Sequence, residues 1–404
     1  MKSTPREPLD SARRQAALQQ FGAALASGMN VALWARFIPD APAVYSATGD
    51  RTFAELNARC NQLTRALRTR GLKAGDSVAL MCGNRTEFAE SFWTTRRAGL
   101  RITAINWHLT GEEAAYIVND CDAKAFIVDA RFEEAALQVR AAAPQASVCI
   151  AIGAPLAGFD NYEAALSGQD SSDIDDPQLG GSMLYTSGTT GRPKGVYRSV
   201  TPVAATSTTA AADYRPGESV HLCTGPLYHA APLAFSLAIP NAYGAATVLM
   251  DGWDSEQALR LIEQRRVTHT HMVPTMFHRL LSLPEATRYR YDISSLKFVL
   301  HGAAPCPVSV KRALIEWLGP IVHEYYAATE GVGTYVDSHT WLSRPGTVGK
   351  PDTPDHIRIR DAAGQELLRN QPGLVYLRAP EQGRFNYYKD EQKTGKAYLG
   401  DYYT

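Results

Sequence analysis

The chain has 404 residues, 45% of them hydrophobic and 20% charged, a composition typical of a soluble globular protein with about two or three subdomains. Lys and Arg together number 41, as do Asp and Glu, so no overall charge attracts nucleic acid or an anionic membrane surface. The six cysteines have no zinc-ligand or disulfide spacing, and the polar first residues show no signal peptide. These features predict a cytoplasmic protein without structural zinc, disulfides or bound nucleic acid.

Strands and helices alternate along the first three quarters of the chain. Short apolar runs at 76–82 and 124–129 have the length of buried strands, and amphipathic stretches at 86–100 and 110–121 have the period of helices. The alternation returns further on, with expected strands and one helix at 219–225, 246–252, 254–267, 268–274 and 296–302. This order predicts an α/β fold with mostly parallel sheets.

The expected organisation is two doubly wound α/β subdomains followed by a small antiparallel β-barrel. The first subdomain is placed at about 50–200 and the second at about 201–335. Near residue 336 the pattern changes to short alternating runs between Gly, Pro and Asp turns, which is typical of antiparallel strands. The pattern alone fits a small barrel or a sandwich, and we expect a β-barrel subdomain at 336–404.

The segment 227–250 imitates a membrane span, because it contains no Asp, Glu, Lys or Arg. It also contains His229, Asn241 and two prolines, and proline interrupts a spanning helix. We interpret the segment as a buried helix followed by a strand at 245–250, and we expect no membrane span.

The stretch at 183–198, MLYTSGTTGRPKGVYR, is rich in Gly, Ser and Thr. Backbone N–H groups in such a turn converge on a point that suits phosphate oxygens, and Lys194 adds a positive charge. The spacing is not that of a P-loop nucleotide triphosphatase. By composition alone, the stretch fits a mobile linker as well as a phosphate site.

Within this stretch, YTSGTTGRPKGV closely resembles the phosphate-loop signature of the adenylate-forming superfamily, which includes acyl-CoA synthetases. Milder similarity extends back to about residue 51. Further segments resemble later motifs in that family's order, namely PLYHAAP at 226–232, VPTMFHRLL at 273–281, HGAAPCP at 301–307, YYAATEG at 325–331, GTVGKP at 346–351 and GLVYLRAP at 373–380. So many ordered matches make the resemblance specific.

The resemblance implies the fold of that family's large N-terminal domain and an ATP-dependent activation of a carboxylic acid. The acid would first form an acyl-adenylate and then a thioester, with ATP, Mg²⁺ and CoA as cofactors or co-substrates. In the family, a small C-terminal domain with a second lysine follows the large domain. We expect that small domain to be absent from 1–404, so the chain should be poorly active alone, and a homodimer is compatible with this reading.

The resemblance also assigns site residues. The implied catalytic residues are Lys194, His229, Thr329 and Glu330, with Glu330 holding Mg²⁺. The implied ATP and AMP site comprises Thr186, Ser187, Gly188, Thr189, Thr190, Lys194, Gly302, Ala303, Ala304, Tyr325, Tyr326 and Thr329. The implied acyl pocket comprises His229, Ala230, Ala231, Ala234, His301, Ala327 and Ala328.

Several of these residues could instead have a purely structural place in the fold. Glu330 also fits an acid on a surface loop, and Tyr326 also fits a core aromatic. His229 could be a satisfied core histidine, and His301 fits the core as well as it fits a pocket wall. At Ala327 the chain departs from the family, which usually has Gly there, so the local shape of the pocket is left open.

The charge of the residues expected near the acyl pocket limits which class of acid can be the substrate. Amino-acid-activating relatives place an Asp in the segment that corresponds to 228–236, where it binds the substrate's ammonium group. This chain has no acid there or anywhere in 227–250, and an unpaired buried ammonium is costly. We expect a medium- or long-chain fatty acid or a bulky polycyclic acid, with an aryl acid still open.

Two alternative functions remain, namely an acyl-AMP ligase that loads a carrier protein and a catalytically silent nucleotide-binding regulator. The joint presence of Lys194, Thr329 and Glu330 argues against the silent regulator.

Overall fold

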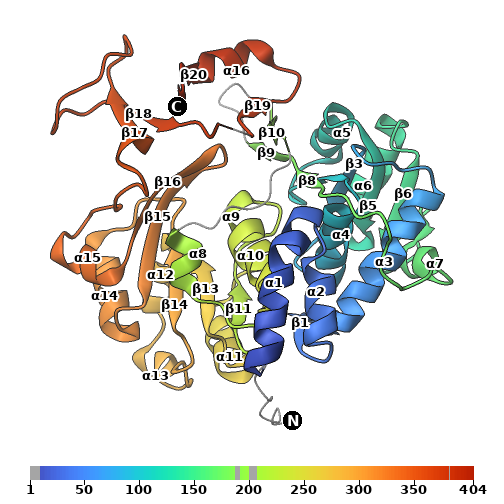
Figure 1. The fold of residues 1–404 in the computed structure, drawn as a ribbon, viewed down its shortest axis with the longest axis horizontal. Coiled ribbons are helices and arrows are strands. Elements are labelled where there is room, and N and C mark those ends of the chain that lie inside the picture. The colour runs from blue at the N-terminus through green and yellow to red at the C-terminus, as the bar shows by residue number, and fades with distance from the viewer. Residues whose placement is uncertain (1–9, 187–191, 200–206, 382) are drawn as a thin grey trace.

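The computed structural model describes residues 10–186, 192–199, 207–381 and 383–404. Two sheets with their helices form two lobes that lie side by side, and a smaller β-rich part lies above them in Figure 1. The predicted α/β fold class with mostly parallel sheets is confirmed.

The first lobe, at the right of Figure 1, contains a six-stranded sheet with the order β7-β6-β5-β3-β4-β8. All of its neighbouring strands pair in parallel. A parallel sheet is covered on both faces, which explains why the apolar strand β3 is buried along its whole length. The strands are β3 (Ser77–Met81), β4 (Arg101–Ala104), β5 (Ala123–Asp129), β6 (Val148–Ile152), β7 (Asp160–Asn161) and β8 (Gly181–Ser182). The helices of this lobe are α3 (Phe53–Thr69), α4 (Thr86–Arg97), α5 (Gly111–Asp120), η1 (Ala130–Phe132), α6 (Glu133–Ala142) and α7 (Tyr162–Leu166).

The second lobe contains an eight-stranded sheet with the order β16-β15-β14-β13-β11-β12-β1-β2. The six central strands pair in parallel, and the two edge strands pair antiparallel to their neighbours. The strands are β1 (Pro42–Tyr45), β2 (Arg51–Thr52), β11 (Val220–Cys223), β12 (Ala246–Leu249), β13 (His269–Met272), β14 (Phe298–His301), β15 (Val322–Ala328) and β16 (Gly331–Val336). The other helices of this lobe are α8 (Ser207–Ala212), α11 (Ser255–Arg265), α12 (Pro274–Leu281), α13 (Glu285–Arg288), α14 (Val308–Leu318) and α15 (Ser338–Ser343).

The apolar segment 227–250 folds as the predicted helix followed by a strand, β12. The helix has three parts, α9 (Ala230–Leu233), a π-helical segment η2 (Ala234–Ala238) and α10 (Ile239–Ala242). Among the described residues, no helix combines the length and apolarity needed to cross a membrane. Short helices that are apolar on every side are typical of a protein interior, because a packed core removes both faces from water.

The C-terminal region is antiparallel, as predicted, but a closed barrel is not confirmed. Its strands fall into two sheets of the described chain, one with the order β17-β18-β21-β20 and one with the order β19-β10-β9. The second sheet joins the C-terminal region to the hairpin that carries the glycine-rich loop. The elements are β9 (Leu184–Thr186), β10 (Lys194–Arg198), η3 (Pro354–His356), β17 (Ile357–Arg360), β18 (Leu374–Arg378), β19 (Phe385–Tyr387), α16 (Glu391–Ala397), β20 (Tyr398–Leu399) and β21 (Tyr402–Tyr403).

Two N-terminal helices, α1 (Ser11–Ser27) and α2 (Asn30–Phe37), pack beside the helix 230–242. Trp34 donates a hydrogen bond from Nε1 to the carbonyl of Ala242 at 2.7 Å. Gly28 ends α1 in the left-handed conformation, and a Cβ there would lie 2.1 Å from the carbonyl oxygen of Arg96. Glycine is therefore required for this turn to approach α4.

Candidate active site

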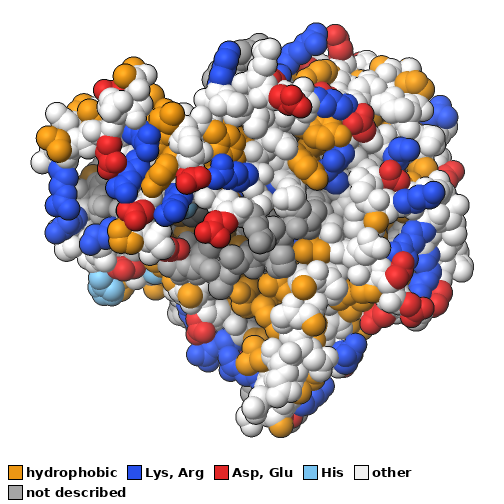
Figure 2. All heavy atoms as spheres, turned by 45° about the horizontal axis from the view of Figure 1, so that its top comes forward, with side chains coloured by type: hydrophobic (Ala, Val, Ile, Leu, Met, Phe, Trp, Pro, Cys, Tyr) orange, Lys and Arg blue, Asp and Glu red, His pale blue; other side chains and the backbone are white. Residues whose placement is uncertain are grey.

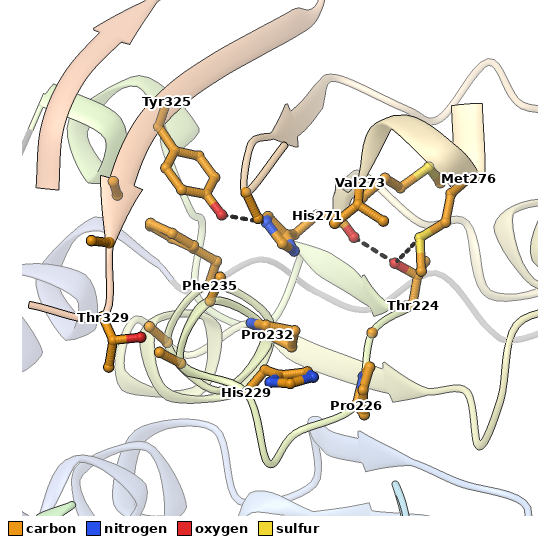
Figure 3. A pocket seen from close by; sticks show the side chains of 18 of the residues that line it. Thr224, Pro226, His229, Pro232, Phe235, His271, Val273, Met276, Tyr325 and Thr329 are labelled. Carbon is orange, nitrogen blue, oxygen red and sulfur yellow. Dashed lines mark hydrogen bonds between the residues drawn. The ribbon is translucent and has the colours of Figure 1, made fainter. Parts of the chain in front are cut away.

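A cavity of about 710 Å³ opens beside the carboxyl ends of β13 and β15 (Figure 3). In open parallel sheets, ligands bind beyond the carboxyl ends of the strands, and this volume lies within the range of small-molecule sites. Figure 3 shows the helix that begins after His229 on one side of the cavity and the residues after β13 on the other. None of the lining residues is an Asp or Glu.

Most of the residues expected for the acyl pocket meet at this cavity, together with part of the expected nucleotide site. The former are His229, Ala230, Ala231, Ala234, Ala327 and Ala328, and the latter are Ala303, Tyr325 and Thr329. They come from three separate parts of the sequence, the helix 230–238, the segment after β14 and the end of β15. The sheet topology brings these parts together, because β13, β14 and β15 are neighbours.

His229 is exposed at the cavity, immediately before α9. The surrounding protein nevertheless desolvates its ring, which lowers the pKa of the imidazole below its usual value. The side chain is therefore neutral near pH 7. A neutral imidazole at an open cavity can accept or donate a hydrogen bond without adding a charge to the acid site.

The far wall of the cavity contains a tyrosine–histidine pair. The Tyr325 hydroxyl lies 3.0 Å from Nε2 of His271, and Phe235 packs against both rings (Figure 3). Burial lowers the pKa of His271 to about 4 and raises the pKa of Tyr325 above its usual value. Both groups are therefore neutral, and they form a rigid polar pair in an otherwise apolar wall.

Close backbone approach holds this pair in place. A Cβ at Gly302 would lie 2.6 Å from Cζ of Tyr325, so only glycine lets the chain after β14 pass the tyrosine ring. The next residue, Ala303, has a φ of 67°, a left-handed conformation that costs a residue with a side chain about 1 kcal/mol. Backbone strain of this kind is common at functional sites.

Tyr326 and His301, which were both predicted for the site, lie away from the cavity lining. Tyr326 follows Tyr325 on β15, so its side chain points to the opposite face of the strand, where 42% of it is exposed. His301, the last residue of β14, is completely buried, and Phe277 of α12 lies edge-on to its ring. Burial lowers the pKa of His301 to about 2. The plainer interpretation of His301 as a core residue fits these surroundings better than a pocket wall. Gly302 and Ala304 also fall outside the lining residues.

The two charged residues expected at the nucleotide are both held by the C-terminal region. Nζ of Lys194 lies 2.8 Å from Oδ2 of Asp390, the residue that caps α16. The Tyr387 hydroxyl donates to Oε1 of Glu330 at 3.0 Å, and Arg198 donates to the carbonyl of Glu330. The hydrogen bond between Lys194 and Asp390 raises the pKa of the lysine and lowers that of the carboxyl. A bound nucleotide would therefore meet a lysine that already has a partner.

The two ends of the glycine-rich loop are described, whereas its centre is not. Thr186 and Lys194 are opposite each other in the antiparallel pair of β9 and β10. The loop is thus the connection of a β-hairpin. The expected phosphate-binding residues Ser187, Gly188, Thr189 and Thr190 lie outside the described residues.

Several residues that line the cavity were not predicted from the sequence, among them Thr224, Phe235, His271 and Met276. The Thr224 hydroxyl donates to the carbonyl of His271 at 2.6 Å, which ties the ends of β11 and β13 together (Figure 3). A usable signal was present, because residues at the carboxyl ends of expected parallel strands face the ligand region. Thr224 and His271 could have been found from that rule alone.

A family model described as "AMP-binding enzyme" matches residues 31–388. The chain is similar to an indoleacetate–CoA ligase of Aromatoleum aromaticum, with 27% identity over 90% of this chain and 71% of that protein. It is also similar to the medium/long-chain-fatty-acid–CoA ligase FadD8 of Mycobacterium tuberculosis, at 27% identity over 84% of this chain and 61% of that protein. A 2,3-dihydroxybenzoate-AMP ligase specific for vibriobactin, from Vibrio cholerae, shows 27% identity over 89% of this chain and 68% of that protein.

Solved structures share the fold. A crystal structure of the anthranilate CoA ligase AuaEII with anthranoyl-AMP superposes with a TM-score of 0.79 and 24% identity, over 93% of this chain and 74% of that one. The N-terminal domain of FACL13 from Mycobacterium tuberculosis superposes with a TM-score of 0.78 and 23% identity, over 94% of both chains. At such identities the likeness establishes the architecture.

Proposed function

Because the chain belongs to the AMP-binding enzyme family, we propose that it activates a hydrophobic carboxylic acid with ATP. A carboxylate oxygen attacks the α-phosphorus of ATP, the bond to pyrophosphate breaks, and an acyl-adenylate remains. In a second step the thiolate of CoA attacks the acyl carbonyl and AMP leaves, which gives the thioester. CoA as the acceptor is supported by the relatives named above, two of which are CoA ligases.

The observation that carries this proposal is the composition of the cavity. Small side chains of the helix 230–238 line it together with Thr329, and no carboxylate lines it. A substrate carboxylate can enter such a site without repulsion from a like charge, whereas an ammonium group would find no partner there. The Thr329 hydroxyl can donate to the reacting oxygens.

At the nucleotide end, the proposed roles rest on charge. Lys194 would neutralise the phosphates, with Thr186 and the loop that follows it as further donors. Preorganised donors and cations around a phosphoryl group lower the barrier by stabilising the charge that develops in the transition state. The ion pair between Lys194 and Asp390 has to open for this.

Magnesium fits the proposed site as a cation that arrives with the phosphates. Among the described residues, no group of three or more His, Cys, Asp and Glu could hold a metal by itself. Mg²⁺ commonly binds through one or two carboxylates together with substrate phosphates, and Glu330 would provide that carboxylate. When bound, the cation would neutralise phosphate charge.

Exchange of radioactive pyrophosphate into ATP tests the proposal in the 404-residue chain. The panel should contain acetate, decanoate, dodecanoate, a polycyclic acid, an aryl acid and an amino acid. We expect exchange to increase with apolar size, since each buried methylene contributes about 0.8 kcal/mol. Exchange that is fastest with acetate or the amino acid would contradict the substrate class. Because the chain is expected to be poorly active alone, the activity would be contradicted only if neither ATP nor any of the acids binds to it.

A further inference from the structure

A second cavity of about 350 Å³ lies next to the first. Arg198, Ala230, Ala234 and Thr329 line both cavities, so only small parts of these side chains separate them. The second cavity continues between the helix 230–242 and the first lobe, where residues of α1, α2 and α4 close it. It therefore extends the proposed acid site toward the N-terminal helices.

Alanines at every fourth position form one side of this second cavity, namely Ala230, Ala234, Ala238 and Ala242. In an ordinary α-helix, residues four apart rotate by about 40° at each step, so such a row would turn away from one face. The π-helical segment Ala234–Ala238 has a wider turn and counteracts this rotation. The helix thus keeps an uninterrupted methyl-lined wall that a slender chain can follow.

The remaining apolar walls come from α1, with Leu25, and from α4 of the first lobe, with Phe92 and Trp93. Together with the alanines they leave few partners for water along the length of the cavity. An alkyl chain would fit these walls, but the end of the cavity has different chemistry.

Where α2 and α4 line the cavity, one buried donor lacks an acceptor and one cation lacks a carboxylate partner. Asn30 is 2% exposed, and its Nδ2 has no hydrogen-bond partner within the described residues. Arg96 donates to the carbonyl of Gly180, but no carboxylate of the described chain pairs with it, and burial lowers its pKa to about 10. No Asp or Glu lines the second cavity. Buried donors without acceptors are destabilising unless a ligand supplies the missing oxygen.

We propose that the second cavity holds the end of the acid that is remote from its carboxylate, and that this end carries an oxygen atom which accepts hydrogen bonds from Asn30 and Arg96. The inference rests on the proposed function, because the carboxylate would lie in the first cavity near Thr329. The preferred substrate is then an elongated acid with a hydroxyl, carbonyl or carboxylate at its far end. The walls between the two ends bind its apolar middle.

The first test compares acids of equal length by isothermal titration to the full 404-residue chain. Dodecanoate, 12-hydroxydodecanoate and dodecanedioate differ only at the far end. We expect at least one of the two oxygenated acids to bind about tenfold more tightly than dodecanoate, the effect of one well-made hydrogen bond. In Asn30→Leu, which has a similar volume and no donor, that preference should disappear while dodecanoate binds as before.

Arg96→Gln distinguishes an anionic far end of the acid from a neutral one, because the variant removes the positive charge but keeps an N–H group. A selective loss of dodecanedioate binding would identify an anionic end, and retained preference for 12-hydroxydodecanoate would identify a neutral one. Melting temperatures close to that of the wild type show that the variants are folded. Equal affinity of the wild type for all three acids, or an unchanged preference in Asn30→Leu, would overturn the proposal.

A second test blocks the cavity sterically. Ala238 lines only the second cavity and Ala231 lines only the first, so they form a matched pair. Ala238→Leu should weaken dodecanoate at least about tenfold and leave hexanoate unaffected, whereas Ala231→Leu should weaken both acids. If Ala238→Leu leaves the chain-length preference unchanged, the far end lies elsewhere. A failure of the proposed function is distinguishable, because then no acid of any length would bind or support pyrophosphate exchange.

Discussion

The acid end and the phosphate end of the site are built in different ways. The acid end is part of the core of the second lobe. Tyr325 on β15 and His271 on β13 belong to one sheet, with β14 between them, and Gly302 packs against the tyrosine ring. The phosphate end lies where the hairpin of β9 and β10, the residues after β15 and the C-terminal region meet. There Lys194 contacts Asp390, and Glu330 contacts Tyr387.

This difference has an energetic consequence. Neutral groups in a packed wall, such as Tyr325 and His271, can bind an apolar substrate without losing their existing partners. Binding there therefore costs little free energy of rearrangement. Lys194 and Glu330 have to exchange protein partners for phosphates and a cation. We therefore expect changes at the acid end to affect folding stability most, and changes at the phosphate end to affect nucleotide binding and catalysis.

The largest expected effect is the loss of stability in acid caused by buried histidines. Burial lowers the pKa of His271 to about 4 from an ordinary value near 6.5. Above pH 6.5 the ring is neutral in both states, and as the pH falls toward 4 only the unfolded chain gains the proton. The free energy of unfolding should therefore drop by about 3 kcal/mol for this group alone between pH 6.5 and 4.

Urea unfolding at several pH values checks this prediction. In His271→Gln the pH dependence should become shallower by roughly the contribution of one histidine, although His269 and His323 keep theirs, since burial lowers the pKa of each to about 4. His278 is exposed on α12 and serves as the control, because His278→Gln should retain the wild-type slope. Equal slopes in both variants would show that His271 does not titrate as a buried group.

The second effect tests how tightly the acid end is packed. Gly302→Ala places a methyl group against the Tyr325 ring, and overpacking of this kind costs about 2 kcal/mol. Calorimetry should show a lower melting temperature, and the affinity for the acid should fall because the tyrosine moves. Gly22→Ala is the control, since a Cβ at Gly22 meets no atom within 4 Å. Wild-type stability of Gly302→Ala would mean that this end of the site is not rigid.

A third prediction concerns catalysis at the phosphate end. Glu330→Gln keeps the shape of the side chain and its contact with Tyr387, so the melting temperature should not change. Pyrophosphate exchange should fall at least about tenfold, because one transition-state contact worth about 1.4 kcal/mol is lost. Undiminished exchange would mean that Glu330 does not act on the phosphates or their cation.

The smallest expected effect is on nucleotide affinity. Asp390→Asn removes the charge that holds Lys194, so ATP should bind about threefold more tightly, in keeping with the modest strength of an ion pair that is still partly exposed to solvent. Asp122→Asn breaks the neighbouring pair with Lys389 and is the matched control, which should leave ATP affinity unchanged. Weaker ATP binding in Asp390→Asn would show that Asp390 positions the lysine instead of competing for it.

The sequence predicted most of the fold and part of the site. Alternating strands and helices indicated the α/β class. The ordered motifs assigned Thr329 and Tyr325 to the nucleotide site and the alanines after His229 to the acyl pocket, and the structure brings these residues to one cavity. The sequence did not predict that Tyr326 faces away from the cavity, because an aromatic pair on a strand does not reveal which ring points inward. The closed C-terminal barrel was expected from composition, and the observed pairing divides those strands between two sheets.

By itself, the sequence determined local chemistry. It determined most of the segments that form strands and helices, and it shows that no acid lies in the segment 227–250. Only the tertiary structure decided what these segments face. Asn30 and Ala238 meet at one cavity, and Asp390 meets Lys194, although each pair is far apart in the sequence. Such contacts depend on how sheets and helices pack, and local propensity carries no information about that packing.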